Sequence, residues 1–180
     1  MNGRELLIGV TGGIAAYKTA ALVSRLVQAG AGVSVVMTRS ATRLVGPKTF
    51  EALTGRPVRT KVFDGGGHPH IELAEAAELF CIAPATANIM AKAALGLADD
   101  LMSTTLLSFN GPLIMAPAMN TQMWQHPAVQ RNAAQLRDDG VILIGPEEGY
   151  LSCGTRGPGR MAEVETIYQA IAKAVGSSRQ

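Results

Sequence analysis

Short apolar runs that alternate with longer helical segments constrain the fold of this chain more than any other feature. The runs lie at residues 6–10, 33–37, 79–83, 113–116 and 141–144. The helical segments lie at residues 14–29, 47–53, 88–95, 101–107, 127–138 and 163–175. Apolar strands that alternate with helices are typical of a parallel sheet covered on both sides. We therefore predict that residues 1–180 form one α/β domain, a three-layer α/β/α arrangement with a Rossmann- or flavodoxin-like parallel sheet.

The composition agrees with an α/β domain and argues against several other classes. Of the 180 residues 47% are hydrophobic and only 4% aromatic, so Ala, Val, Leu, Ile and Met carry the apolar content. A net charge of +2 and scattered Lys and Arg argue against a nucleic-acid partner. No apolar run approaches the ~20 residues of a membrane span, and two cysteines make no disulfide framework. We expect a soluble cytoplasmic protein with reduced thiols and no membrane partner.

The first two apolar runs end in turns that suit an anion. Thr11-Gly12-Gly13 leads from the first run into a helix, whose backbone N–H groups would point at a phosphate. The turn is not G-x-G-x-x-G, so the dinucleotide fingerprint is weak. Thr38-Arg39-Ser40 follows the second run and carries no acidic residue for a ribose. It suits a second contact to one phosphate, although helix capping by Thr38 is an equally good explanation.

Polar turns also follow the third and fourth runs, at the sheet edge where open α/β folds bind ligands. Thr86 and Asn88 follow the third run, and Pro117-Ala118-Met119-Asn120 follows the fourth. The amide of Asn120 offers an acceptor and two donors, which suits a planar group such as a carboxylate. Taken by itself, this segment favours capping of the next helix by Asn120.

Histidines near a glycine loop are a further candidate site. The loop spans residues 64–67, and His70 stands at the start of a short helix. A helix N-terminus disfavours imidazolium, so it can keep His70 neutral and able to accept a proton. A merely solvated histidine is the alternative. We expect no metal site, because no Cys/His/Asp cluster at ligand spacing accompanies His68 and His70.

The C-terminal part contains a glycine-rich segment at residues 146–161, which we predict to be irregular. A loop of this length is usually functional or disordered, and its Cys, Tyr and two Arg favour a lid over disorder. Cys153 in this segment can approach a ligand, although a solvated thiol is the alternative, whereas Cys81 lies in a strand as an inert hydrophobe. Residues 176–180 are expected to form a mobile tail.

Five motifs in order resemble those of the homo-oligomeric flavin-containing cysteine decarboxylases. They occupy residues 9–18, 70–73, 83–88, 117–124 and 153–161. The resemblance covers about residues 5–175 and departs at Glu78, where the family more often has Asp.

This resemblance implies FMN bound noncovalently in a trimer, with the flavin between subunits and with dodecamers in some members. The phosphate would lie on Gly12, Gly13 and Ile14 at the first helix, with Thr38 and Ser40 beside it. The remaining flavin contacts implied by the resemblance are Thr86, Asn88 and Ser103.

The resemblance also implies decarboxylation of 4′-phosphopantothenoylcysteine to 4′-phosphopantetheine in coenzyme A biosynthesis. His70 would assist proton movement during oxidation to a thioaldehyde, and Asn120 would hold the substrate carboxylate. After loss of carbon dioxide, the reduced flavin would reduce the enethiol, with Cys153 as the acid. The 146–161 segment would act as a substrate clamp, and the other substrate contacts would be Met123, Arg160 and Met161.

Three alternative functions have related sequences. A peptidyl-cysteine decarboxylase shares the His and Pro-x-Met-Asn motifs but stops at the enethiol. A flavin prenyltransferase would not be expected to carry Asn120 and Cys153 in these contexts. A non-enzymatic flavoprotein-like regulatory subunit typically lacks part of the catalytic set or adds acidic tails.

Overall fold

A five-stranded parallel sheet forms the centre of the molecule in the computed structural model, which describes residues 1–63 and 67–177. The strands are β1 (Glu5–Val10), β2 (Gly32–Met37), β3 (Leu79–Ala85), β4 (Leu113–Pro117) and β5 (Ile142–Leu143). Their order is β2-β1-β3-β4-β5, and every neighbouring pair is parallel. The predicted parallel flavodoxin-like sheet is therefore confirmed. The order reverses between β1 and β3, so the turns after these two strands flank the position where such sheets bind ligands.

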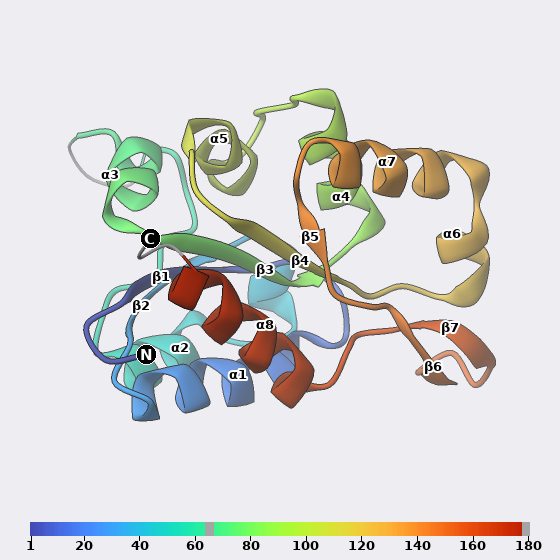
Figure 1. The fold of residues 1–180 in the computed structure, drawn as a ribbon, viewed down its shortest axis with the longest axis horizontal. Helices are drawn as coiled ribbons and strands as arrows, with labels where there is room; N and C mark the ends of the chain where they lie inside the picture. The colour runs from blue at the N-terminus through green and yellow to red at the C-terminus, as the bar shows by residue number, and fades with distance from the viewer. Residues whose placement is uncertain (64–66, 178–180) are drawn as a thin grey trace.

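Helices cover both faces of the sheet, as the three-layer prediction requires (Figure 1). The lower layer in the figure contains α1 (Ala16–Gln28), α2 (Pro47–Thr54) and α8 (Val164–Ser177). The upper layer contains α3 (Pro69–Ala76), α4 (Ala87–Leu95), α5 (Leu101–Ser108) and α7 (Pro127–Asp138). Two short helices, η1 (Ala41–Arg43) and α6 (Thr121–Gln125), follow β2 and β4, and neither was predicted from the sequence.

Successive side chains of each strand point to opposite faces of the sheet, and each face contributes to one of two hydrophobic cores. Ile8 and Cys81 face one core, where they pack with Leu22 of α1. Leu7 and Phe80 face the other core, with the upper helices. Because both faces are buried, the strands read as continuous apolar runs in the sequence. No helix in the described ranges is long and apolar enough to cross a membrane.

The prediction of an irregular segment at residues 146–161 is wrong. Residues in this stretch form an antiparallel pair of strands, β6 (Glu147–Tyr150) and β7 (Arg156–Arg160). Its glycines permit close packing rather than irregularity. A Cβ on Gly159 would lie 2.2 Å from the carbonyl oxygen of Met119, and φ of this glycine is +145°. Glycine therefore lets β7 lie against the turn after β4.

Part of the predicted mobile tail is helical. Helix α8 continues to Ser177, so residues 176–177 are helical, and residues 178–180 lie outside the described ranges. Most of the predicted glycine loop, residues 64–66, lies outside them as well.

The hydroxyl of Thr11 links the two strand ends at the point where the sheet order reverses. Thr11 is buried, donates to the carbonyl oxygen of Pro84 at 2.7 Å and accepts from the backbone N–H of Thr86 at 3.2 Å. Nearby, Thr19 of α1 donates to the carbonyl oxygen of Ala83 at 2.6 Å. These bonds hold the turn after β1 in place beside the end of β3.

We expect Thr11→Val to lower the free energy of unfolding by about 1–3 kcal/mol, because it leaves buried backbone groups without a partner. Thr166→Val is the matched control, since Thr166 is exposed in α8 and makes no side-chain hydrogen bond with another described residue. Urea denaturation followed by circular dichroism measures both. Equal stability of the two variants would contradict the structural role of Thr11.

Candidate functional site

A cleft of about 470 Å³ opens at the carboxyl edge of the sheet, beside the reversal between β1 and β3. Its walls come from the turns after β1, β3 and β4 and from the β6–β7 hairpin. The cleft brings together many of the residues predicted from the sequence. These are Gly12, Gly13, Ile14, Thr86, Asn120, Met123, Cys153, Arg160 and Met161. The segments are far apart in the chain, so the fold itself assembles this site.

The turn after β1 has the geometry of an anion cradle. A Cβ on Gly12 would lie 2.4 Å from the Cβ of Ser40, so a larger residue would not fit there. Within the described ranges, the backbone N–H groups of Gly12, Ile14 and Ala15 donate to no protein acceptor. They precede α1, whose N-cap has no side-chain hydrogen bond. Free N–H groups at a helix start are suited to bind phosphate.

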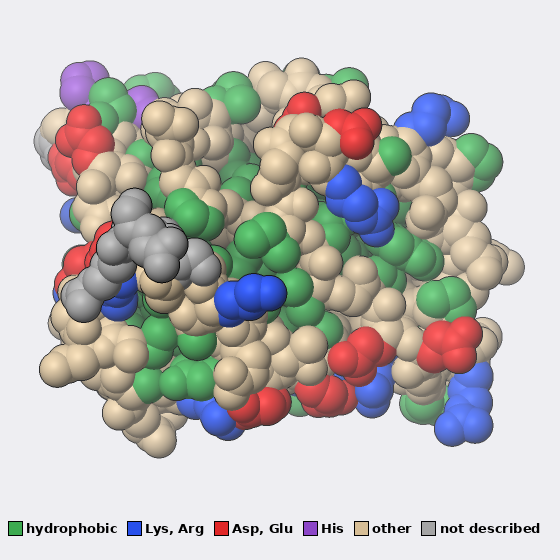
Figure 2. Space-filling view, in the orientation of Figure 1, with side chains coloured by type: hydrophobic (Ala, Val, Ile, Leu, Met, Phe, Trp, Pro, Cys, Tyr) green, Lys and Arg blue, Asp and Glu red, His purple; other side chains and the backbone are tan. Residues whose placement is uncertain are grey.

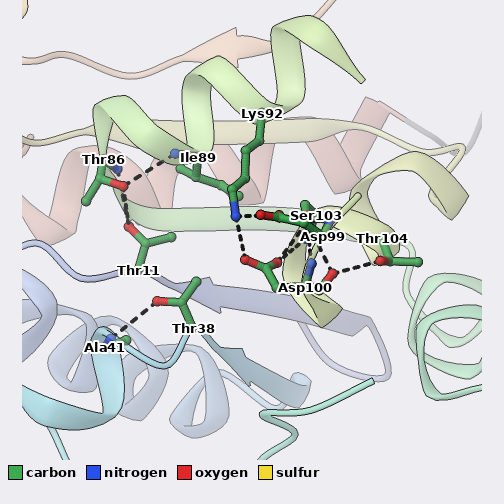
Figure 3. Close-up of polar contacts among 10 residues, drawn as sticks. All are labelled: Thr11, Thr38, Ala41, Thr86, Ile89, Lys92, Asp99, Asp100, Ser103 and Thr104. Atoms are coloured by element: carbon green, nitrogen blue, oxygen red, sulfur yellow. Dashed lines mark hydrogen bonds and ion pairs between the residues drawn. The ribbon is translucent and has the colours of Figure 1, made fainter. Parts of the chain in front are cut away.

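The turn after β2 lies against this cradle. Ser40 packs next to Gly12, as the predicted second contact to one anion requires. The hydroxyl of Thr38 accepts from the backbone N–H of Ala41 at 3.3 Å, although the N-cap of η1 is Ser40 and not Thr38. Figure 3 shows Thr38 across from Thr11 and Thr86, on the opposite side of the same region. Thr38, Ser40 and Thr86 therefore belong to one sheet edge.

Four residues predicted to contact FMN do not line the cleft, namely Thr38, Ser40, Asn88 and Ser103. Asn88 is exposed on the first turn of α4. Ser103 is fully buried and caps α5 together with Asp100, accepting from the N–H of Asp100 at 3.1 Å. Nζ of Lys92 lies 2.8 Å from Oδ2 of the Asp100 carboxylate (Figure 3). Burial opposes ionisation of Asp100, but hydrogen bonds from Lys92 and Ser103 hold the pKa of that carboxyl below its usual value.

His70, the predicted proton acceptor, also lies away from the cleft. It lies near the start of α3, at the left in Figure 1, whereas the β6–β7 hairpin lies at the right. Figure 2 shows histidine side chains at the surface above α3. Nδ1 of His70 is buried and has no hydrogen-bond partner among the described residues. Within a single chain, His70 therefore lies away from Asn120 and Cys153.

Asn120 combines the two roles considered from the sequence. Its Oδ1 accepts from the backbone N–H of Met123 at 2.7 Å, so the side chain caps α6. The same side chain lines the cleft, and its Nδ2 donates to no other described residue. Because the cap occupies the acceptor, the amide is oriented with its donors available to a ligand. An oxyanion such as a carboxylate would accept from them.

The two cysteines have opposite environments. Cys153 lies in the connection between β6 and β7, is exposed and lines the cleft. The hydroxyl of Thr155 lies 3.2 Å from its Sγ and lowers the pKa of the Cys153 thiol below its ordinary value. Cys81 is fully buried in β3, and desolvation raises its pKa to about 12. The predicted contrast between a reactive and an inert cysteine is consistent with these positions.

Ion pairs neutralise both cations that line the cleft. Arg160 lies 2.9 Å from Glu147 and 3.1 Å from Glu163. Lys18 lies 3.5 Å from Glu163. Arg160 therefore fastens β7 to β6 and to the segment before α8, in addition to lining the cleft.

Two aromatic residues that line the cleft were not predicted from the sequence to contact a ligand. Tyr17 is 62% exposed and Tyr150 is 67% exposed, although both are large side chains. Tyr17 stands at the start of α1, directly after the glycine turn, and this position could have indicated a ligand contact. Tyr150 was counted only among the side chains that favour a lid at residues 146–161, and the pairing of β6 with β7 brings it to the cleft.

Comparison with known proteins places the chain in a family. The Flavoprotein family model matches residues 1–176. The chain belongs to the Flavoprotein family. It is 49% identical over 176 residues to the coenzyme A biosynthesis bifunctional protein CoaBC of Bacillus subtilis (strain 168). That match covers 96% of this chain but 43% of the bifunctional protein, so the chain spans less than half of this relative.

Solved structures of Flavoprotein-like fold agree with this assignment. The FMN-dependent cysteine decarboxylase SpaF is 37% identical with a TM-score of 0.87, and the match covers 99% of this chain and 98% of SpaF. A mutant PPC decarboxylase complexed with pantothenoylaminoethenethiol is 31% identical with a TM-score of 0.84. That match covers 94% of this chain and 97% of the decarboxylase.

We expect Thr155→Val in this Flavoprotein-family chain to slow alkylation of Cys153 near neutral pH. Thr155 lowers the pKa of the thiol, so its removal moves the midpoint of the pH–rate profile upward, toward the ordinary value. Iodoacetamide labelling followed by mass spectrometry measures the profile. Cys153→Ser gives the background, because buried Cys81 should not react. An unchanged midpoint would show that the hydroxyl does not act on the thiol.

Proposed function

We propose that this domain is an FMN-dependent decarboxylase that converts 4′-phosphopantothenoylcysteine to 4′-phosphopantetheine in coenzyme A biosynthesis. The observation that carries the proposal is one cleft that joins a phosphate-binding glycine turn to Asn120 and Cys153. The 49% identity to a coenzyme A biosynthesis protein supports this pathway. The likeness to an FMN-dependent cysteine decarboxylase and to a PPC decarboxylase supports this chemistry.

The turn after β1 fits the phosphate of FMN. Gly12 leaves room that a Cβ would fill, and free N–H groups surround the same place. Ser40 and Thr86 border the turn with hydroxyls. When bound, FMN would accept a hydride from the cysteine side chain, whose thioaldehyde form has the electron sink that loss of carbon dioxide needs, and would return this hydride to the enethiol.

Asn120 and Cys153 have different roles toward the substrate. The Nδ2 donors of Asn120 hold the carboxylate that leaves as carbon dioxide, in an orientation fixed by the cap to Met123. Cys153 holds, on Sγ, the proton that the enethiol needs to become a saturated thiol. Thr155 makes this thiol a stronger acid by stabilising its thiolate. Met161 is buried at the base of the cleft and fills its apolar wall.

Proton removal during the oxidation is assigned to His70 of a neighbouring subunit. The chain places its own His70 away from Asn120, so one subunit lacks a complete set. A cyclic trimer, alone or within a dodecamer, would bring α3 of one subunit to the cleft of the next. The buried Nδ1 of His70, which has no partner among the described residues, supports a role that begins only on assembly.

A peptidyl-cysteine decarboxylase is the second candidate, because the 37% identity and TM-score of 0.87 to the FMN-dependent cysteine decarboxylase SpaF support decarboxylation of a cysteine without fixing what carries it. Such an enzyme stops at the enethiol and has no need of an acid. Cys153, with its lowered pKa at the cleft, favours the complete reaction to the saturated thiol.

The wild-type protein should be yellow, release FMN on heating and convert 4′-phosphopantothenoylcysteine to 4′-phosphopantetheine. Cys153→Ser should release carbon dioxide but give the enethiol, about two mass units lighter, because a hydroxyl is a far weaker acid than a thiol. Mass spectrometry of the products measures the difference. A saturated product from the variant at the full rate would remove Cys153 from this role, and an enethiol from the wild type would favour the second candidate.

Mixed oligomers test whether His70 crosses a subunit boundary. His70→Asn and Asn120→Asp should each be nearly inactive, the latter because its carboxylate repels that of the substrate. Co-expression with two different tags isolates mixed oligomers of both variants. If each site takes His70 from one subunit and Asn120 from the next, every mixed cyclic trimer has one intact site, so about a third of the sites in the isolated trimers are intact. No recovery of carbon dioxide release would place both residues within one subunit.

A further inference from the structure

A second cavity of about 350 Å³ adjoins the cleft at the tip of the hairpin. Its lining residues are Asn120, Thr121, Gln122, Cys153, Thr155 and Arg156. It shares Asn120 and Cys153 with the main cleft, so a ligand held at these two residues reaches both spaces. The second cavity therefore extends the proposed substrate site away from the glycine turn.

The charges around the two cavities differ in one respect. Lys18 and Arg160 of the main cleft are paired with carboxylates. Arg156 of the second cavity is exposed and forms no ion pair with any described residue. Its remaining neighbours in the lining, such as Gln122 and Thr155, are neutral and polar. An anion bound in this cavity would therefore lie near the guanidinium of Arg156, which is not paired with a carboxylate of a described residue.

The proposed substrate carries an anion at each end. Its carboxylate would lie at Asn120, and its phosphate stands at the end of an arm with two amide bonds. The arm spans about four residue-lengths, or roughly 14 Å when extended. The glycine turn is assigned to the phosphate of FMN, so the phosphate of the substrate needs a different cation. A guanidinium is suited to it because its planar N–H donors match phosphate oxygens.

We propose that Arg156, with Gln122 and Thr155 beside it, receives the phosphate of the substrate and is a specificity-determining residue. The inference rests on the proposed function and deepens it. Arg156 favours a phosphorylated pantothenoyl arm over an unphosphorylated arm or a peptide. The charge at residue 156 then distinguishes a coenzyme A precursor from a peptidyl cysteine, whereas Asn120 and Cys153 recognise the part that both share.

The test compares 4′-phosphopantothenoylcysteine with pantothenoylcysteine in the FMN-loaded enzyme. Arg156→Gln should raise KM for the phosphorylated compound roughly tenfold, as expected for loss of a charge-assisted hydrogen bond. The ratio of the two KM values should therefore approach one, and the salt dependence of the phosphorylated KM should weaken. FMN absorbance should stay as in the wild type, which separates this phosphate from that of the flavin.

Arg131→Gln is the matched control, because Arg131 is exposed on α7, forms no ion pair with a described residue and lies outside the lining of both cavities. It should keep the wild-type preference. Calorimetric binding of 4′-phosphopantothenate and pantothenate makes the test independent of turnover. Absence of carbon dioxide release by the wild type would refute the proposed function, whereas equal binding of these two compounds by the wild type, or an unchanged preference in Arg156→Gln, would refute the role of Arg156.

Discussion

The bond network of the Thr11 hydroxyl is the constraint on which the rest of the site depends. It joins the turn after β1 to Pro84 and Thr86 at the end of β3. These strands are neighbours at the reversal of strand order, where helices leave toward opposite faces and a gap opens between them. A parallel sheet creates that gap by its topology, but only fixed strand ends give it a constant shape. The buried threonine supplies the fixation with a single side chain.

A backbone hydrogen bond links the β6–β7 hairpin to the turn after β4. The N–H of Met119 donates to the carbonyl oxygen of Gly159 at 3.0 Å, in the turn that also positions Asn120. Arg160 extends the attachment through its ion pairs with Glu147 and Glu163. The base of the hairpin is therefore held firmly, while Cys153 at its tip remains exposed. Such a division would allow Cys153, the proposed acid, to approach a ligand without disturbing Asn120, the proposed contact to the carboxylate.

The sequence was sufficient for features that depend on local patterns. Apolar runs predicted the strands, and turns after those runs predicted that Gly12, Asn120 and Thr86 lie at one sheet edge. It was insufficient where spatial neighbours decide the outcome. The glycines of 146–161 resemble those of an irregular loop, and only the close approach of β7 to Met119 shows why they are there. The capping role of Ser103 likewise depends on partners that composition does not reveal.

Because His70 lies away from the cleft, its position bears on whether a single subunit can be active. A proton acceptor must come within hydrogen-bond distance of the atom that loses the proton, and no side-chain motion within this fold moves α3 to the far end of the sheet (Figure 1). The glycine turn and the hairpin, in contrast, meet within a single chain. If His70 takes part, one subunit can bind cofactor and substrate but cannot complete the oxidation. Assembly would then be a chemical requirement of this domain, because a site divided between two copies becomes active only when they meet.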